Sequence, residues 1–262
     1  MGKVISICNQ KGGVGKTTTT LDLAAALHGQ GKRVLAIDGD QQRNLTSSLL
    51  SGVTEKQSLS ELLHYTVAGI LCTPDMFICR TNCGVDLIGS SKLLAAANSI
   101  LATSNDSEGV LAKAIDAVTH GGQDYDFILI DCAPSLDLLV SNALTASDGV
   151  VIPTEPASYS VDGIVGVWET ITRIQRTTNP KLRVECILIN KYDARKKDDQ
   201  LHVSEIREAF GDSVFPEPFP LLAEIKDSVD MGKRQTMLTS RRSRAWPLYR
   251  RLAEEVINNY ES

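Results

Sequence analysis

The feature that most constrains the fold is a glycine-rich loop that joins a β-branched run to a helical one. Residues 3–9, "KVISICN", have the pattern of a buried strand, and residues 17–31, "TTTTLDLAAALHGQG", have apolar residues at helical spacing. Backbone N–H groups of such a loop, together with the dipole of the following helix, bind anionic oxygens. The pattern predicts a phosphate-binding loop made of Gly12, Gly13, Val14, Gly15, Lys16, Thr17 and Thr18.

The two lysines of this loop have different expected roles. Lys16 precedes the helix, where its ammonium would reach the terminal phosphates of a nucleotide, and the Thr17 hydroxyl would be a ligand of Mg²⁺. The strict spacing G-x-x-x-x-G-K-[ST] is not met, because position 10 is Gln. Lys11 stands instead at the entrance of the loop, where an ordinary phosphate loop needs no cation.

The rest of the chain alternates continuous apolar strands with helices. Strands are predicted at residues 33–38, 85–89, 126–131, 149–154 and 183–190, and helices at residues 136–147, 160–175, 203–210 and 247–260. Residues 45–120 are expected to be mostly helical. This alternation predicts an α/β fold, a doubly wound and mostly parallel sheet with helices on both faces. Because no linker or repeat is visible, residues 1–262 are expected to form a single domain.

Composition excludes several classes of protein. With 42% hydrophobic and 23% charged residues, the chain is neither disordered nor fibrous. No apolar run approaches the roughly 18 residues of a membrane span, and the N-terminus has no signal-peptide pattern, so a cytoplasmic protein is expected. The cysteines at 72, 79 and 83 lack the C-x2-C spacing of metal sites, which favours small buried side chains over a metal or iron–sulfur site.

Charge is distributed unevenly. The net charge is −5, but seven basic and no acidic residues lie between Met231 and Arg251, which leaves the remainder at −12. Such a segment is the electrostatic footprint of phosphate contacts without base recognition. A solvated face with a few ion pairs is the alternative.

The loop "KGGVGKTT" resembles the deviant Walker A motif of the ParA/MinD superfamily of P-loop ATPases, also called the SIMIBI class. The second lysine is the mark of that family. The resemblance implies that Lys11 reaches across a dimer interface to the phosphates of the partner's nucleotide, so that a homodimer forms when ATP is bound. The alternative is a solvated surface lysine beside an ordinary phosphate loop.

Two further segments are similar to family motifs. "VLAIDGDQQRN" resembles the second-strand motif, which implies that Asp40 lies near the γ-phosphate and orients the attacking water, with Asp38 assigned to the metal site. "FILIDCAPS" resembles Walker B, which implies that Asp131 holds Mg²⁺ through a bound water. Lys11, Lys16 and Asp40 are thus the expected catalytic residues. Asp38 and Asp40 could instead cap the turn after their strand.

The same motifs separate the branches of the superfamily. The partition ATPases ParA and Soj typically carry D-x-D-P-Q-x-N and D-x-x-P-S, and this chain matches except at Gln41, where proline is usual, and at Arg43, where a small residue is usual. "ILINKYDAR" looks like the strand and turn that supply the adenine pocket. Asn190 is its candidate base contact, or simply a cap of the strand end.

The resemblance implies a weak ATPase, with ATP and Mg²⁺ as cofactors, that binds DNA non-specifically and associates with the nucleoid. It would partition or position a cargo with a ParB-like or adaptor protein that stimulates hydrolysis. The candidate DNA contacts are Lys226, Lys233, Arg234, Arg241, Arg242 and Arg244, with residues 195–197 as a second basic patch or a solvated loop.

Two other functions are considered. A MinD-like positioning ATPase needs an apolar and basic C-terminal amphipathic helix, whereas this chain ends in "RRLAEEVINNYES", so no membrane partner is expected. A metabolic ATP-dependent ligase would use the same loop but leaves the basic segment unexplained.

Overall fold

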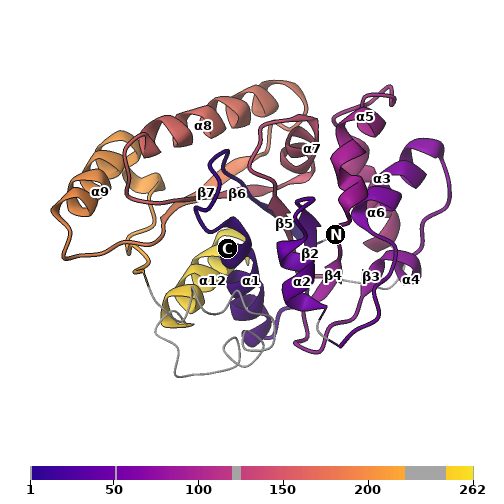
Figure 1. Ribbon diagram of the computed structural model, residues 1–262, viewed down its shortest axis with the longest axis horizontal. Helices are drawn as coiled ribbons and strands as arrows, with labels where there is room; N and C mark the ends of the chain where they lie inside the picture. The colour runs from indigo at the N-terminus through magenta and orange to yellow at the C-terminus, as the bar shows by residue number, and fades with distance from the viewer. Residues whose placement is uncertain (1, 51, 120–124, 222–245, 262) are drawn as a thin grey trace.

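The computed structural model describes residues 2–50, 52–119, 125–221 and 246–261 (Figure 1). Within these residues, seven strands form one sheet in the order β3-β4-β2-β5-β1-β6-β7. The strands are β1 (Lys3–Ile7), β2 (Val34–Gly39), β3 (Ile78–Cys79), β4 (Asp86–Ile88), β5 (Phe127–Cys132), β6 (Gly149–Thr154) and β7 (Arg183–Ile189). Each neighbouring pair is parallel except β3 with β4, which is antiparallel. The predicted mostly parallel sheet is confirmed, and the short edge strand β3 was not predicted.

Helices cover both faces of this sheet. One face carries α1 (Lys16–Gly29), α2 (Asn44–Leu49) and α12 (Trp246–Glu261). The other carries α3 (Leu59–Ala68), α6 (Val110–Thr119), α7 (Leu138–Ala146), α8 (Ser160–Thr177) and α9 (Lys197–Phe210). Shorter pieces are α4 (Pro74–Phe77), α5 (Ala97–Leu101) and the 3₁₀ helices η1 (Lys92–Ala96) and η2 (Gly211–Ser213). Although α1 and α12 come from opposite ends of the chain, they pack side by side (Figure 1).

Alternation along the strands divides the core into two layers. In β1, Val4 belongs to the cluster under α3 and α8, whereas Ile5 belongs to the cluster under α1 and α12. In β2, Leu35 likewise belongs to the cluster under α3 and α8, and Ala36 belongs to the cluster under α1 and α12. Because successive side chains of a strand point to opposite faces, strands buried on both sides must be apolar throughout. This two-layer core confirms the predicted doubly wound fold.

The carboxyl ends of the parallel strands lie at one edge of the sheet. In the register, Ile7 of β1 lies opposite Asp131 of β5, and Asp131 lies opposite Asp38 of β2. The chain after β1, the acids that end β2 and β5, and the residue after β7 therefore meet in one region. In open α/β sheets this edge is where ligands bind.

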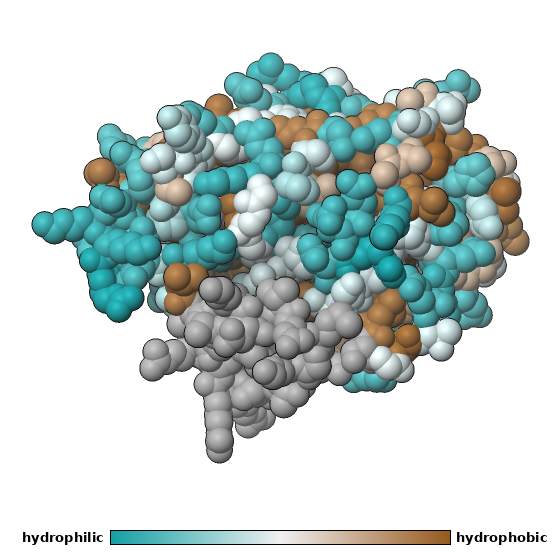
Figure 2. All heavy atoms as spheres, viewed as in Figure 1, coloured by the Kyte–Doolittle hydropathy of each residue, from teal (hydrophilic) through white to brown (hydrophobic). Residues whose placement is uncertain are grey.

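Hydrophilic side chains cover most of the face seen in Figure 2, most densely over α9 at the left. Among the described helices, none combines the length and the apolar content that crossing a bilayer requires. Cys72 and Cys79 are buried with free thiols, in agreement with their predicted role as small core side chains, whereas Cys83, for which the same was predicted, is only partly buried.

Candidate nucleotide site

The glycine-rich loop lies between β1 and α1 and has the backbone that glycine allows. Gly13 and Gly15 have φ of 77° and 95°, in the left-handed region that disfavours any residue with a Cβ. A Cβ added at Gly12 or Gly13 would meet no atom within 4 Å, so the loop borders open space. That space is a cleft of about 430 Å³. Its lining comprises Gly12, Gly13, Gly15, Lys16, Thr17, Thr18, Asp40, Gln42, Asn44, Ser47, Ser48 and Pro134.

The cleft contains the N-terminus of α1 without a protein cap. Gly15 is the N-cap residue, and in the described structure no side chain caps the backbone N–H groups of the first turn, which also has no acid. The free N–H groups of a helix start attract anions. A second hollow of about 460 Å³, along α8 and beside Phe210, has no helix N-terminus or glycine loop in its lining. The cleft at the loop is therefore the candidate site for a phosphate.

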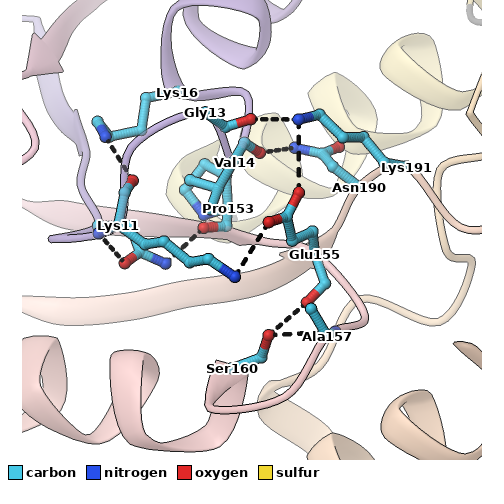
Figure 3. Close-up of polar contacts among 11 residues, drawn as sticks. Lys11, Gly13, Val14, Lys16, Pro153, Glu155, Ala157, Ser160, Asn190 and Lys191 are labelled. Atoms are coloured by element: carbon cyan, nitrogen blue, oxygen red, sulfur yellow. Dashed lines mark hydrogen bonds and ion pairs between the residues drawn. The ribbon is translucent and has the colours of Figure 1, made fainter. Parts of the chain in front are cut away.

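Lys16 is buried and spans the loop. Its Nζ donates a hydrogen bond to the Lys11 carbonyl at 3.0 Å (Figure 3). Burial lowers the pKa of the Lys16 ammonium, and the charge of Asp131 opposes this effect. A cation that lines a cleft with unpaired N–H groups is suited to an anion of high charge.

Lys11 does not line this cleft; its ammonium forms an ion pair with Glu155 Oε1 at 3.0 Å (Figure 3). The other carboxylate oxygen of Glu155 lies 3.4 Å from Lys191 Nζ, which also donates to the Gly13 carbonyl. Burial raises the pKa of Glu155, but the two lysines outweigh this and lower it overall. Glu155 and Lys191 could not be predicted from the sequence, because no local motif relates them to the loop.

Two carboxylates stand side by side where β2 and β5 end. Asp131 is fully buried, and burial followed by the charge of Asp38 raises its pKa to about 8, against the Thr17 hydrogen bond and the Lys16 charge. Its Oδ1 lies 3.5 Å from the Thr20 hydroxyl, whereas its Oδ2 has no partner among the described residues. An orphaned buried carboxylate oxygen beside a threonine hydroxyl suits a hard cation such as Mg²⁺.

Asp38 is occupied by the protein itself. Its Oδ2 accepts hydrogen bonds from the Thr46 amide and hydroxyl at 2.8 and 2.6 Å, and its Oδ1 accepts one from the Asp40 amide at 3.1 Å. Burial raises the pKa of Asp38 overall, although the Thr46 hydrogen bonds partly oppose this effect. These contacts match the turn-capping alternative and attach α2 to β2. The metal role of Asp38 stays a prediction.

Asp40 reaches the cleft from the turn that follows β2. It is nearly buried, lines the cleft with Lys16 and Thr17, and accepts a hydrogen bond from the Gln42 amide at 2.9 Å through Oδ1. The structure thus brings Asp40 to the same cavity as the phosphate loop. Its role toward water stays a prediction.

Two asparagine side chains form hydrogen bonds to the backbone of the loop. Asn190 Nδ2 donates to the Val14 carbonyl at 2.9 Å and lies 3.4 Å from the Thr19 hydroxyl, so the described amide group holds the loop (Figure 3). The predicted adenine contact of Asn190 stays a prediction. Asn9, which no sequence motif singles out, donates to the Pro153 carbonyl at 2.7 Å and accepts from the Lys11 amide at 3.0 Å.

The predicted DNA contacts fall outside the described residues. These are Lys226, Lys233, Arg234, Arg241, Arg242 and Arg244. Arg250 and Arg251, at the end of the same basic segment, lie on α12 and form ion pairs with Glu254 and Glu217. In the second basic patch, Arg195 forms an ion pair with Asp193 at 2.8 Å. The described arginines of both patches therefore have acidic partners.

Comparisons with known proteins agree with this geometry. Residues 2–184 match the model of a family described as "AAA domain". The sporulation initiation inhibitor protein Soj of Bacillus subtilis is 38% identical, over 99% of this chain and 100% of Soj. The chromosome partitioning protein ParA of Caulobacter vibrioides is 32% identical, over 98% of this chain and 94% of ParA. Among solved structures, cobyrinic acid a,c-diamide synthase of Mycobacterium smegmatis, with bound ADP and magnesium, is similar with a TM-score of 0.83. It is 29% identical, and the match covers 100% of this chain and 96% of the synthase.

Proposed function

Since the chain belongs to the AAA domain family and to the group of Soj and ParA partition ATPases, we propose that it is an ATP-dependent switch that moves or positions a cargo. It binds ATP with Mg²⁺, pairs with a second copy, binds DNA non-specifically as the pair, and is released after a weak hydrolysis that a ParB-like partner stimulates. The observation that carries this proposal is the placement of the two loop lysines, Lys16 in the cleft and Lys11 outside it.

The residues of the cleft divide the chemistry. Loop N–H groups and Lys16 hold the phosphates and compensate their charge. Thr17 and Asp131 would hold Mg²⁺, which supplies further compensation of the charge that develops on the phosphoryl oxygens. Asp40 accepts a hydrogen from the attacking water and orients it, since an acid near the cleft can act by positioning alone.

Lys11 is proposed to act on the nucleotide of the partner subunit. Its side chain is 37% exposed, and the partner it has within the chain is a carboxylate that is 25% exposed. An exposed ion pair of this kind contributes little stability, so the lysine can exchange Glu155 for phosphates of much higher charge. Pairing then depends on occupied clefts, which makes dimerisation contingent on ATP.

The basic segment is proposed to bind DNA through its phosphates. If each protomer neutralises about three phosphates, a dimer has a log–log salt slope of about −5. Binding would carry no base preference and would place the ATP-bound pair on the nucleoid.

The proposal is tested by comparing the wild type with Asp40→Ala in ATP and in ADP. Sedimentation velocity should show a dimer of Asp40→Ala in ATP and a monomer in ADP, and only the dimer should shift DNA, less at the higher of two salt concentrations. A monomer in ATP, or equal DNA binding in ATP and ADP, would contradict the proposed switch. A hydrolysis rate in Asp40→Ala equal to that of the wild type would remove Asp40 from the mechanism.

A metabolic ligase is the second candidate, because the similar synthase from Mycobacterium smegmatis covers the whole chain. Turnover that needs neither DNA nor a protein activator, and that rises with a small carboxylic acid, would favour it. The same ATPase assay distinguishes the two candidates.

A further inference from the structure

The turn that carries Asp40 controls where its carboxylate lies. The Arg43 amide donates to the Asp40 carbonyl at 3.0 Å, which closes a four-residue turn with Gln41 and Gln42 at its centre. The Gln42 amide donates to Asp40 Oδ1 at 2.9 Å. Because the carboxylate is bonded to the backbone of its own turn, any loosening of the turn displaces the carboxylate in the cleft.

Arg43 attaches this turn to two other segments. Its Nε donates to the Ser90 carbonyl at 2.8 Å, just after β4, and its Nη2 forms an ion pair with Glu55, between α2 and α3. We call these three residues the Arg43 clasp. Arg43 also has φ of 59°, a conformation that residues with a Cβ disfavour. Among the described residues that line the cleft are Asp40 and Gln42, but not Arg43. Arg43 can therefore influence the site only through the backbone on either side of it, which is the turn before it and the start of α2 after it.

The second position of the turn explains why a clasp is useful. Proline is favoured there because its ring presets φ, and the resembling partition ATPases carry it at this place. This chain has an exposed Gln41 instead, and within the described residues its amide donates no hydrogen bond that proline would remove. Without a proline ring to restrain its backbone, the turn must be restrained by non-covalent contacts such as those of Arg43.

We propose that Arg43 is a positioning residue for Asp40, and that the Arg43 clasp replaces the rigidity that a proline at position 41 would supply. The proposal rests on the proposed function, in which Asp40 orients the attacking water. It predicts that the two departures from the family pattern, at positions 41 and 43, compensate for each other.

The test is a double-mutant cycle on the full chain with Arg43→Ala, Gln41→Pro and the double variant. With saturating ATP and Mg²⁺, Arg43→Ala should lower kcat by about threefold to tenfold, the effect of losing one hydrogen bond and one exposed ion pair. Its dissociation constant for ATP should stay within about twofold, since the clasp does not touch the cleft. The double variant should recover kcat to within about twofold of the wild type, and Glu55→Gln should show a smaller loss than Arg43→Ala.

Amide order parameters of Gln42 and Arg43, measured by NMR without nucleotide, report on the turn itself. They should fall from about 0.85 toward 0.6 in the variant that lacks the arginine and return in the double variant. Arg207→Ala, which removes another arginine bonded to a carbonyl, is the matched control and should leave both readouts unchanged.

Three results would overturn the proposal: an unchanged kcat in Arg43→Ala, unchanged order parameters, or a double variant as slow as Arg43→Ala. Failure of the proposed function is distinguishable. It would appear as a wild-type turnover no faster than that of Asp40→Ala, and the order parameters would then still decide whether the clasp restrains the turn.

Discussion

Asp131→Asn should make the nucleotide-free protein more stable at alkaline pH. The carboxyl is fully buried, its Oδ2 lacks a partner among the described residues, and its pKa rises from 3.8 to about 8. Asparagine keeps the shape and the oxygen that faces Thr20 but removes the charge. Asp131, which we propose holds Mg²⁺, is thus predicted to destabilise the folded protein when no nucleotide or cation is bound.

The magnitude follows from linkage between protonation and folding. Between the two pKa values the folded chain keeps a proton that the unfolded chain releases, so the free energy of unfolding falls as pH rises from about 4 to about 8. At about 1.36 kcal/mol for each pKa unit, the full difference corresponds to about 6 kcal/mol. An unpaired amide N–H in the variant costs about 1–3 kcal/mol. We expect Asp131→Asn to be about 3 kcal/mol more stable than the wild type at pH 8. Near pH 4 it should be about 1–2 kcal/mol less stable, because the wild-type carboxyl is then protonated and the cost of the unpaired amide remains.

Urea denaturation at several pH values, with EDTA and without nucleotide, measures this difference. Asp212→Asn, which removes an exposed carboxylate, is the control and should follow the wild type. Curves for Asp131→Asn and the wild type that run parallel from pH 5 to pH 8, or a variant that is less stable at pH 8, would refute the reasoning. With ATP present, Mg²⁺ should stabilise the wild type and not the variant, because the variant lacks the carboxylate that the cation would compensate.

The remaining predictions concern the two loop lysines and one glycine. Lys16→Ala should weaken ATP binding by at least about 100-fold in a fluorescence titration, since it removes the buried cation that we propose faces the phosphates; an unchanged dissociation constant would exclude Lys16 from the phosphate site. Glu155→Gln should release Lys11 and tighten the ATP-dependent dimer by about twofold to fivefold in sedimentation equilibrium, the effect of one partly exposed ion pair. Weaker pairing would instead indicate that Glu155 itself contributes to the interface. Gly39→Ala would place a Cβ 2.8 Å from the Asp131 carbonyl oxygen and should lower the free energy of unfolding by about 1–3 kcal/mol in thermal denaturation, whereas unchanged stability would show that β2 and β5 can separate there.

Much of the fold could be predicted because its signals are local. Strands buried on both faces are continuous apolar runs, and the helices that follow them have a different period, so element order and sheet class follow from neighbouring residues. β3 escaped prediction because two residues that pair antiparallel at a sheet edge leave no periodic signal. The phosphate loop could be predicted equally well, because its residues are contiguous in the sequence.

The partners of the loop residues could not be predicted from spacing. Glu155 is 144 positions from Lys11, and Asn190 is 176 positions from the Val14 carbonyl that it supports. Asp38 was assigned to a metal on its motif, yet three hydrogen bonds from Thr46 and Asp40 use both of its oxygens. A motif identifies the chemical group at a position, but not which other residues of the protein form hydrogen bonds to that group.

The sequence by itself determined the sheet, the anion-binding loop and the acids that end its strands, because each depends on the φ and ψ preferences and the burial of adjacent residues. Only the tertiary structure decided which groups are free to act. In the folded chain Lys11 forms an ion pair with Glu155, and Asp38 accepts hydrogen bonds from Thr46. One carboxylate oxygen of Asp131 has no hydrogen-bond partner among the described residues. The physical reason is that charge and hydrogen-bond partners act over a few ångströms of space, however many residues separate them along the chain.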